Sequence, residues 1–164
     1  MAIKITFLGA GSSVFVRNVL GDCIIHPELE DLTFALYDID AQRLEDSYLM
    51  LHAICAHYGK SVKMEKYVGV EELPQALTGA NFLICAVQVG GYDPCTISDF
   101  EIPKKYGLRQ TIADTLGVGG VFRALRTIPV MEMFGKMAEK YCPNAVFLNY
   151  SNPMGMLSGY MERY

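Results

Sequence analysis

The sequence predicts an α/β fold of the Rossmann type, a doubly wound parallel sheet of five strands in the order 3-2-1-4-5. Short apolar runs alternate with helical patterns along the whole chain, which is the plan of such a sheet. The first run leads into the glycine-rich turn Gly9-Ala-Gly-Ser12, and the second is followed by an acidic residue, Asp38. These two features are typical of the first half of a dinucleotide-binding domain.

Five segments are predicted to be strands of a parallel sheet. The first is a β-branched, apolar run that ends at Gly9, the second ends at Asp38, and the fourth is strongly apolar. They cover residues 3–8, 32–37, 62–67, 81–87 and 145–148. Right-handed crossovers place the first three strands in the order 3-2-1, and the chain then returns past the first strand to the fourth and fifth.

The segments between the strands have helical spacing. In the first of them Val16, Leu20 and Ile24 fall on one helix face, and in the second Gly59 is a C-cap candidate. A proline inside a helix removes a backbone donor, so Pro129 is expected to interrupt the fourth helix. A long loop is expected at residues 88–96. The helices are expected at residues 13–26, 41–58, 71–77, 116–141 and 153–164.

Composition limits the class of protein and its partners. The 164 residues, 51% apolar and 20% charged, are predicted to form one globular domain over 1–164. A net charge of −4 without a basic run predicts no nucleic-acid or membrane partner. The sequence lacks both a signal-peptide layout and the roughly 20 apolar residues of a membrane helix, so a cytoplasmic location is expected. Five scattered cysteines are expected to be reduced thiols.

The glycine turn predicts a dinucleotide site. Glycine at positions 9 and 11 allows a tight turn and the close approach of a pyrophosphate, which the N–H groups of the next helix then bind. The third glycine of the usual fingerprint is replaced by Val14. Asp38 stands where it can accept from the adenosine ribose hydroxyls, and its charge favours NAD over NADP. The alternative interpretation is a tight turn without a ligand.

Three further segments are candidates for the reacting end of the site. The loop Gln88–Thr96 follows the fourth strand, at the edge where open α/β sheets bind ligands. Asp114 precedes the glycines of a helix start, where it can bind a ligand or cap the helix. Asn152 follows the fifth strand and can bind substrate or form an Asx turn. The residues show no metal-ligand cluster and no nucleophile elbow, and the three histidines fall away from these segments.

These segments together closely resemble the family 4 glycoside hydrolases, in their α-galactosidase branch. The matching stretches are residues 5–12, 35–40, 88–92, 110–115 and 148–154. The resemblance implies an NAD- and manganese-dependent hydrolase that abstracts hydride at C3 of the sugar and a proton at C2. It also implies that the metal ligands and the tyrosine base lie beyond residue 164. The chain is then expected to be an N-terminal fragment, inactive alone, without the second domain of an enzyme that forms a homo-oligomer.

The same resemblance implies roles for particular residues. Gly9, Gly11, Ser12, Ser13 and Asp38 would bind the dinucleotide. Asn152 would bind the substrate, and Asp114 would support the tyrosine base. Relatives that act on 6-phosphorylated glycosides carry a basic residue near position 96, whereas this chain has Cys95 and Thr96, so an unphosphorylated α-galactoside is expected.

Two other classes of protein remain as alternatives. A malate- or lactate-type 2-hydroxyacid dehydrogenase shares the fold plan and an asparagine after the fifth strand. Such an enzyme needs an arginine in the loop after the fourth strand to hold the carboxylate, and residues 88–99 contain none. The third interpretation is a non-catalytic NAD-binding domain.

Overall fold

The computed structural model describes residues 2–164 and confirms the predicted parallel sheet, with the order β3-β2-β1-β4-β5. β1 pairs in parallel with both β2 and β4, and β2 pairs in parallel with β3. The chain therefore reverses its direction of winding between β1 and β4, as in other doubly wound sheets. The strands are β1 (Ile3–Leu8), β2 (Leu32–Asp38), β3 (Lys63–Val68), β4 (Phe82–Cys85) and β5 (Val146–Asn149).

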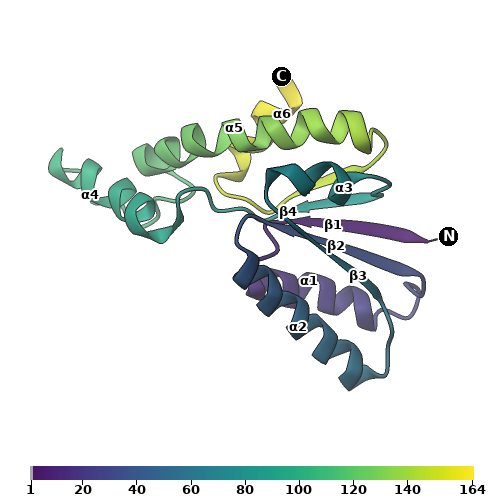
Figure 1. The fold of residues 1–164 in the computed structure, drawn as a ribbon. Helices are drawn as coiled ribbons and strands as arrows, with labels where there is room; N and C mark the ends of the chain where they lie inside the picture. Colours follow the sequence, from purple (N-terminus) through teal and green to yellow (C-terminus); the bar gives the residue numbers. More distant parts are fainter. Residues whose placement is uncertain (1) are drawn as a thin grey trace. The chain divides into compact units, whose positions relative to one another are not determined.

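Helices connect the strands, as Figure 1 shows. A short 3₁₀ turn, Val70–Glu72, precedes α3, and a π-helical segment, Gly91–Thr96, precedes α4. No helix of residues 2–164 is both long enough and apolar enough to cross a membrane. The helices are α1 (Ser13–Ile25), α2 (Ala41–Tyr58), α3 (Leu73–Leu77), α4 (Ile97–Lys105), α5 (Gly117–Tyr141) and α6 (Met154–Arg163).

The chain forms two compact units. The sheet unit consists of the residues up to Val87 together with Met137–Leu148. The helical unit consists of Gln88–Lys136 and Asn149–Tyr164. The helical unit thus contains α4, α6 and most of α5.

The core of the sheet unit follows from the alternation of side chains along β1. Ile5 and Phe7 belong to a buried apolar cluster with residues of α1 and α2, among them Leu20 and Leu51. Figure 1 shows α1 and α2 side by side on one face of these strands. Thr6 points to the other face, where its hydroxyl donates to the Ala76 carbonyl of α3 at 2.8 Å. Each fully buried side chain of this size contributes about 1.5–3 kcal/mol.

Helix α2 has the ends that its sequence predicts. At its start, Asp40 accepts from the backbone N–H groups of Gln42 and Arg43, at 3.0 and 3.1 Å. At its end, Gly59 adopts the left-handed conformation, with φ of 61°, which a residue with a side chain adopts at a cost. The C-cap prediction is confirmed.

Two predictions about the helices were wrong. Pro129 does not interrupt α5, which runs without a break from Gly117 to Tyr141. Proline has no backbone N–H, so the carbonyl of Leu125, four residues earlier, receives no helical hydrogen bond. Because Pro129 and Leu125 are both exposed, water can bind that carbonyl. The other difference is α4, for which no helix was expected. Its sequence contains Pro103 and lacks a continuous apolar stripe, so periodicity did not reveal it.

Candidate functional site

The first part of the candidate site is the glycine turn between β1 and α1, in the sheet unit. Gly9 has φ of 88°, and a Cβ atom there would lie 2.9 Å from the Ala86 carbonyl oxygen. At Gly11 a Cβ atom would lie 2.8 Å from Oδ2 of Asp38. Both positions therefore need glycine because of the chain's own packing, in addition to any need for a phosphate to approach.

Asp38 lies directly against this turn. Its Oδ2 accepts from the N–H of Gly11 at 2.6 Å, and its Oδ1 accepts from the N–H of Asp40 at 2.9 Å. The structure thus brings together two positions, 11 and 38, that the sequence analysis assigned to one dinucleotide site. A carboxylate oxygen accepts two hydrogen bonds, so Asp38 keeps the capacity to accept from a ribose hydroxyl.

The start of α1 differs from the start of α2. Within the described residues, Ser12 makes no side-chain cap and the first turn of α1 contains no acidic residue, whereas Asp40 caps α2. Backbone N–H groups at an uncapped helix start attract an anion. Ser13 and Val14 are exposed there. The Val14 side chain, 61% exposed, points away from the core, so the missing third glycine does not hinder the packing of α1 on the sheet.

The second part of the candidate site lies in the helical unit. Asp114 and Asn152 are brought together there, although 38 residues separate them. Oδ2 of Asp114 accepts from Nδ2 of Asn152 at 3.4 Å, and Oδ1 accepts from the Thr115 hydroxyl at 3.4 Å. These distances are at the long end for hydrogen bonds. The Asx turn before α6 is formed by Asn149, which accepts from the N–H of Ser151 at 2.8 Å, and not by Asn152.

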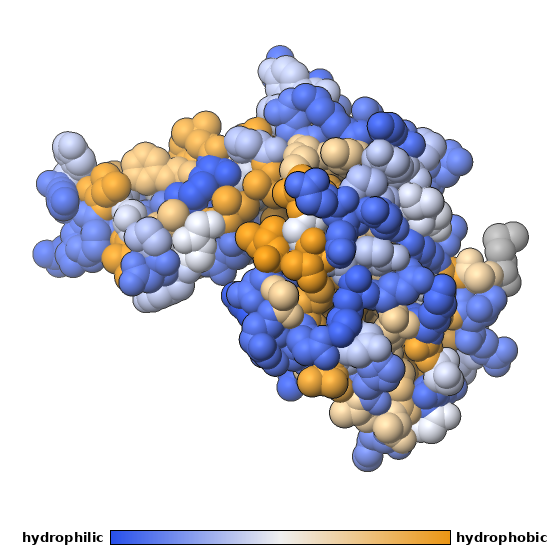
Figure 2. Space-filling model, in the orientation of Figure 1, coloured by the Kyte–Doolittle hydropathy of each residue, from blue (hydrophilic) through white to orange (hydrophobic). Residues whose placement is uncertain are grey.

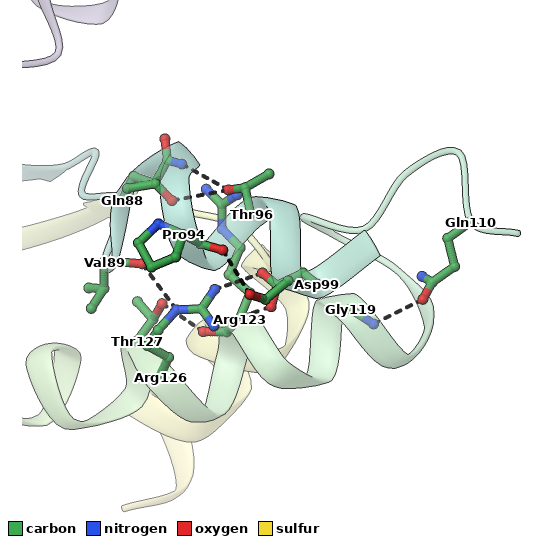
Figure 3. A network of polar contacts seen from close by, with 12 residues as sticks. Gln88, Val89, Pro94, Thr96, Asp99, Gln110, Gly119, Arg123, Arg126 and Thr127 are labelled. Atoms are coloured by element: carbon green, nitrogen blue, oxygen red, sulfur yellow. Dashed lines mark hydrogen bonds and ion pairs between the residues drawn. The ribbon is translucent and has the colours of Figure 1, made fainter. Parts of the chain in front are cut away.

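The cap of α5 is Gln110, a role that the sequence analysis did not assign. Its Oε1 accepts from the N–H of Gly119 at 3.1 Å, as Figure 3 shows, and its Nε2 donates to the Leu116 carbonyl at 3.0 Å. α5 begins at Gly117, three residues after Asp114, and the contacts of the Asp114 carboxylate are to side chains. The alternative that Asp114 caps this helix was therefore wrong.

The loop after β4 is held by a partly buried ion pair. Arg126 binds both carboxylate oxygens of Asp99, at 3.2 and 2.7 Å, and its Nε donates to the Val89 carbonyl at 3.2 Å (Figure 3). The hydrogen bonds to Asp99 raise the pKa of the Arg126 guanidinium. The Thr96 hydroxyl accepts from Gln88 at 3.2 Å. These residues are far apart in sequence, so spacing alone gave no signal for the network. The proximity of this loop to the dinucleotide site stays a prediction.

Residues 2–164 contain no group of three or more His, Cys, Asp or Glu side chains that could hold a metal ion. All five cysteines are free thiols, with Cys55, Cys85 and Cys142 buried.

A five-stranded parallel sheet with this order, a glycine turn after β1 and an acidic residue at the end of β2 define the Rossmann class of dinucleotide-binding folds. Comparison with known proteins gives the family. Residues 4–164 match the sequence model described as "Family 4 glycosyl hydrolase". The chain belongs to the family 4 glycosyl hydrolases, and the family prediction is confirmed.

Two relatives of known activity are similar over almost the whole chain. The chain is 55% identical over 161 residues to an α-galactosidase of Bacillus subtilis (strain 168), covering 98% of this chain and 37% of the relative. It is 35% identical over 155 residues to an α-galacturonidase of Thermoanaerobacter italicus, covering 94% of this chain and 32% of the relative. The chain thus spans about a third of the length of these relatives.

Solved structures agree with the sequence comparison. A 6-phospho-β-glucosidase from Thermotoga maritima, determined with manganese, NAD+ and glucose-6-phosphate, is 27% identical. It superposes with a TM-score of 0.83, covering 99% of this chain and 37% of that chain. A lactate dehydrogenase from Cryptosporidium parvum has a TM-score of 0.64 at 14% identity, and covers 99% of this chain and 42% of that one. The second likeness shows the shared fold alone.

Proposed function

We propose that this chain is the cofactor-binding part of an NAD- and manganese-dependent α-galactosidase. The observation that carries the proposal is the bond between Asp38 and Gly11, which joins two residues of the proposed dinucleotide site, in a chain 55% identical to an α-galactosidase. The Thermotoga maritima relative, which was determined with NAD+ and manganese, supports the two cofactors.

The residues of the sheet unit fit NAD. The N–H groups at the start of α1 would bind the pyrophosphate, with Ser12 and Ser13 beside it. Asp38 would accept from the ribose hydroxyls and repel a 2′-phosphate. Gly9 and Gly11 would leave the backbone open to the phosphates.

The residues of the helical unit would act on the sugar. When bound, NAD supplies the hydride acceptor for C3 of the sugar and the divalent metal supplies a Lewis acid. Asn152 donates to Asp114 through Nδ2, so its Oδ1 would accept from a sugar hydroxyl. The charge of Asp114 would favour the protonated form of a nearby tyrosine and so raise its basicity toward the C2 proton. That base and the metal ligands would lie outside residues 2–164.

The first experiment tests the activity. The full-length enzyme, given NAD, Mn²⁺ and a thiol, is expected to release nitrophenol from a nitrophenyl α-galactoside and to leave the corresponding α-galacturonide intact. Cys95 and Thr96, in place of a basic residue, support the neutral sugar. Reduction of pyruvate or oxaloacetate by NADH, without glycoside hydrolysis, would instead establish the dehydrogenase alternative. Turnover by the 164-residue chain alone would overturn the assignment of the base and the metal ligands to other residues.

The second experiment tests Asp114. Asp114→Asn keeps the shape of the side chain and removes its charge, so kcat and kcat/KM are expected to fall together, as for an interaction made in the transition state. The isotope effect on cleavage of the C2–H bond is expected to grow. The NAD affinity is expected to stay the same. A normal kcat would show that the carboxylate has no part in the reaction.

A further inference from the structure

We infer that Gln110 is a positioning residue for Asp114: by capping α5 it keeps the Asp114 carboxylate directed toward Asn152. The inference rests on the proposed function, since it assigns Gln110 to the same reaction. It concerns residues of the helical unit alone.

The side-chain amide of Gln110 makes two hydrogen bonds to the start of α5, and together we call them the Gln110 staple. One end of its amide accepts from the Gly119 N–H at 3.1 Å and the other donates to the Leu116 carbonyl at 3.0 Å. The segment between Gln110 and Gly119 contains Asp114, so the two bonds close a loop of chain that includes this residue (Figure 3 shows the bond to Gly119). Gly119 is the third residue of α5, whose N–H has no partner within the helix.

The glycines at the start of α5 preserve this staple. A Cβ atom on Gly117 would collide with the amide nitrogen of Gln110. A Cβ atom on Gly119 would lie 2.6 Å from the Cβ atom of Ala113, and one on Gly120 would lie 2.9 Å from the Thr115 carbonyl carbon. These three glycines therefore bring the 110–116 segment against the helix start, close enough for one side chain to span both.

Because Gln110 caps α5, the Gly119 N–H is not available to bind the Asp114 carboxylate in competition with Asn152. Aspartate is among the preferred partners of the N–H groups at a helix start, and Asp114 is only three residues before α5. Its bond to Asn152 is long, at 3.4 Å, and so is easily exchanged for a shorter bond to a backbone N–H. Without Gln110, the carboxylate would turn toward the helix start and leave Asn152.

A glutamine suits this position better than related residues. Glutamate accepts from Gly119 but has no donor for Leu116 when ionised, and it adds a second negative charge near Asp114. Leucine has a similar size and makes neither bond. The pair Gln110→Leu and Gln110→Glu therefore separates loss of the whole staple from loss of its donor half.

The test measures turnover in the full-length enzyme. Gln110→Leu is expected to lower kcat by about 10–100-fold, the loss typical of a misplaced catalytic group, with NAD affinity unchanged. Gln110→Glu is expected to recover part of the rate because it still caps Gly119. In the Asp114→Asn background, Gln110→Leu is expected to lower kcat by less than about twofold, since interacting residues are non-additive. Gln42→Leu, at the exposed start of α2, is the matched control and is expected to leave kcat unchanged.

Two results would overturn the inference. One is an unchanged kcat in Gln110→Leu, and the other is an equal loss in the presence and absence of the Asp114 charge. The chemical shift of the Asn152 side-chain amide gives a readout without turnover: it is expected to change in Gln110→Leu and not in Gln42→Leu. If the wild-type enzyme hydrolyses no galactoside, the proposed function fails, and the amide shift still decides whether Gln110 positions Asp114.

Discussion

The sheet unit and the helical unit are stabilised in different ways. Most of the buried apolar residues in the described chain belong to the sheet unit, including Phe7, Phe34 and Leu36, which are fully buried. The helical unit instead exposes large apolar side chains, such as Leu116 at 63% and Leu125 at 65%. Figure 2 shows this apolar surface over the first half of α5. The buried apolar residues of the helical unit are Ala113, Ala124, Met131, Phe134 and Leu157.

This difference indicates how each part of the site is supported. The dinucleotide turn rests on an apolar core, whose stabilisation is large and non-directional. In the helical unit, the segment with Asp114 is held by the two hydrogen bonds of Gln110, and the loop after β4 is held by the ion pair of Arg126 with Asp99. Single hydrogen bonds contribute only about 0.5–1.5 kcal/mol each, but they fix direction. The segment that the proposed function assigns to the sugar is therefore expected to be fixed in direction and to be less stable than the sheet.

The largest expected effect is on the core of the sheet unit. Phe34→Ala removes a ring that is fully buried and leaves a cavity, so the free energy of unfolding is expected to fall by about 3–5 kcal/mol. The matched change at an exposed position, Leu49→Ala, is expected to alter it by less than about 0.5 kcal/mol. Urea denaturation measures both. Equal losses would contradict a core centred on the sheet.

The next effect is on the ion pair of the helical unit. Asp99→Asn leaves the Arg126 guanidinium without its charged partner. Breaking a fully buried ion pair costs about 3–5 kcal/mol. Because the Arg126 side chain is 24% exposed, we expect the free energy of unfolding to fall by less, about 2 kcal/mol. Hydrogen exchange is expected to quicken in α4 and in the loop after β4, and to stay unchanged in β1 and β2.

The control for that prediction is Glu101→Gln, which breaks the exposed pair of Glu101 with Lys104 and is expected to change little. Faster exchange throughout the sheet in Asp99→Asn would show that the two units unfold as one.

A smaller effect is expected at the start of α1, where one substitution should change NAD binding and the stability of the helix in opposite directions. Ser13→Asp places a negative charge in the first turn, which stabilises a helix and repels a pyrophosphate. NAD binding is expected to weaken by about 1–2 kcal/mol while the melting temperature stays the same or rises. Asn18→Asp, at an exposed position farther along α1, is the control, with calorimetry as the measurement. An unchanged NAD affinity in Ser13→Asp would contradict the proposal that the pyrophosphate binds at the start of α1.

The smallest effect is expected at the edge strand β3. Burial, and then the hydrogen bond to Glu65 at 2.9 Å, raise the pKa of Tyr67 to about 12. Because the folded-state pKa is the higher one, the stabilisation is complete below pH 10 and is lost as the pH rises toward 12. Ultraviolet titration of the phenols is expected to show Tyr67 ionising late, and earlier in Glu65→Gln. Identical titrations would exclude a role for Glu65.

The sequence predicted the features that depend on local composition. Strand order, the glycine turn and Asp38 follow from apolar runs, winding rules and one acidic residue at the end of a strand. The sequence did not reveal the cap by Gln110 or the pair of Arg126 with Asp99. These contacts join residues 9 and 27 positions apart through a fold whose details no spacing rule encodes. Pro129 was misjudged because its consequence depends on exposure, which is a property of the folded chain.

The bond between Asp38 and Gly11 has a consequence for cofactor engineering. Because the carboxylate already fixes the turn, the proposed NAD site is preorganised, and binding of NAD there would order little additional backbone. The same carboxylate would exclude a 2′-phosphate. Cofactor preference and loop shape are thus coupled through one side chain. A substitution at position 38 that removes the charge without leaving a side-chain acceptor would also release the Gly11 N–H, so a change toward NADP is expected to need a residue that still accepts this bond.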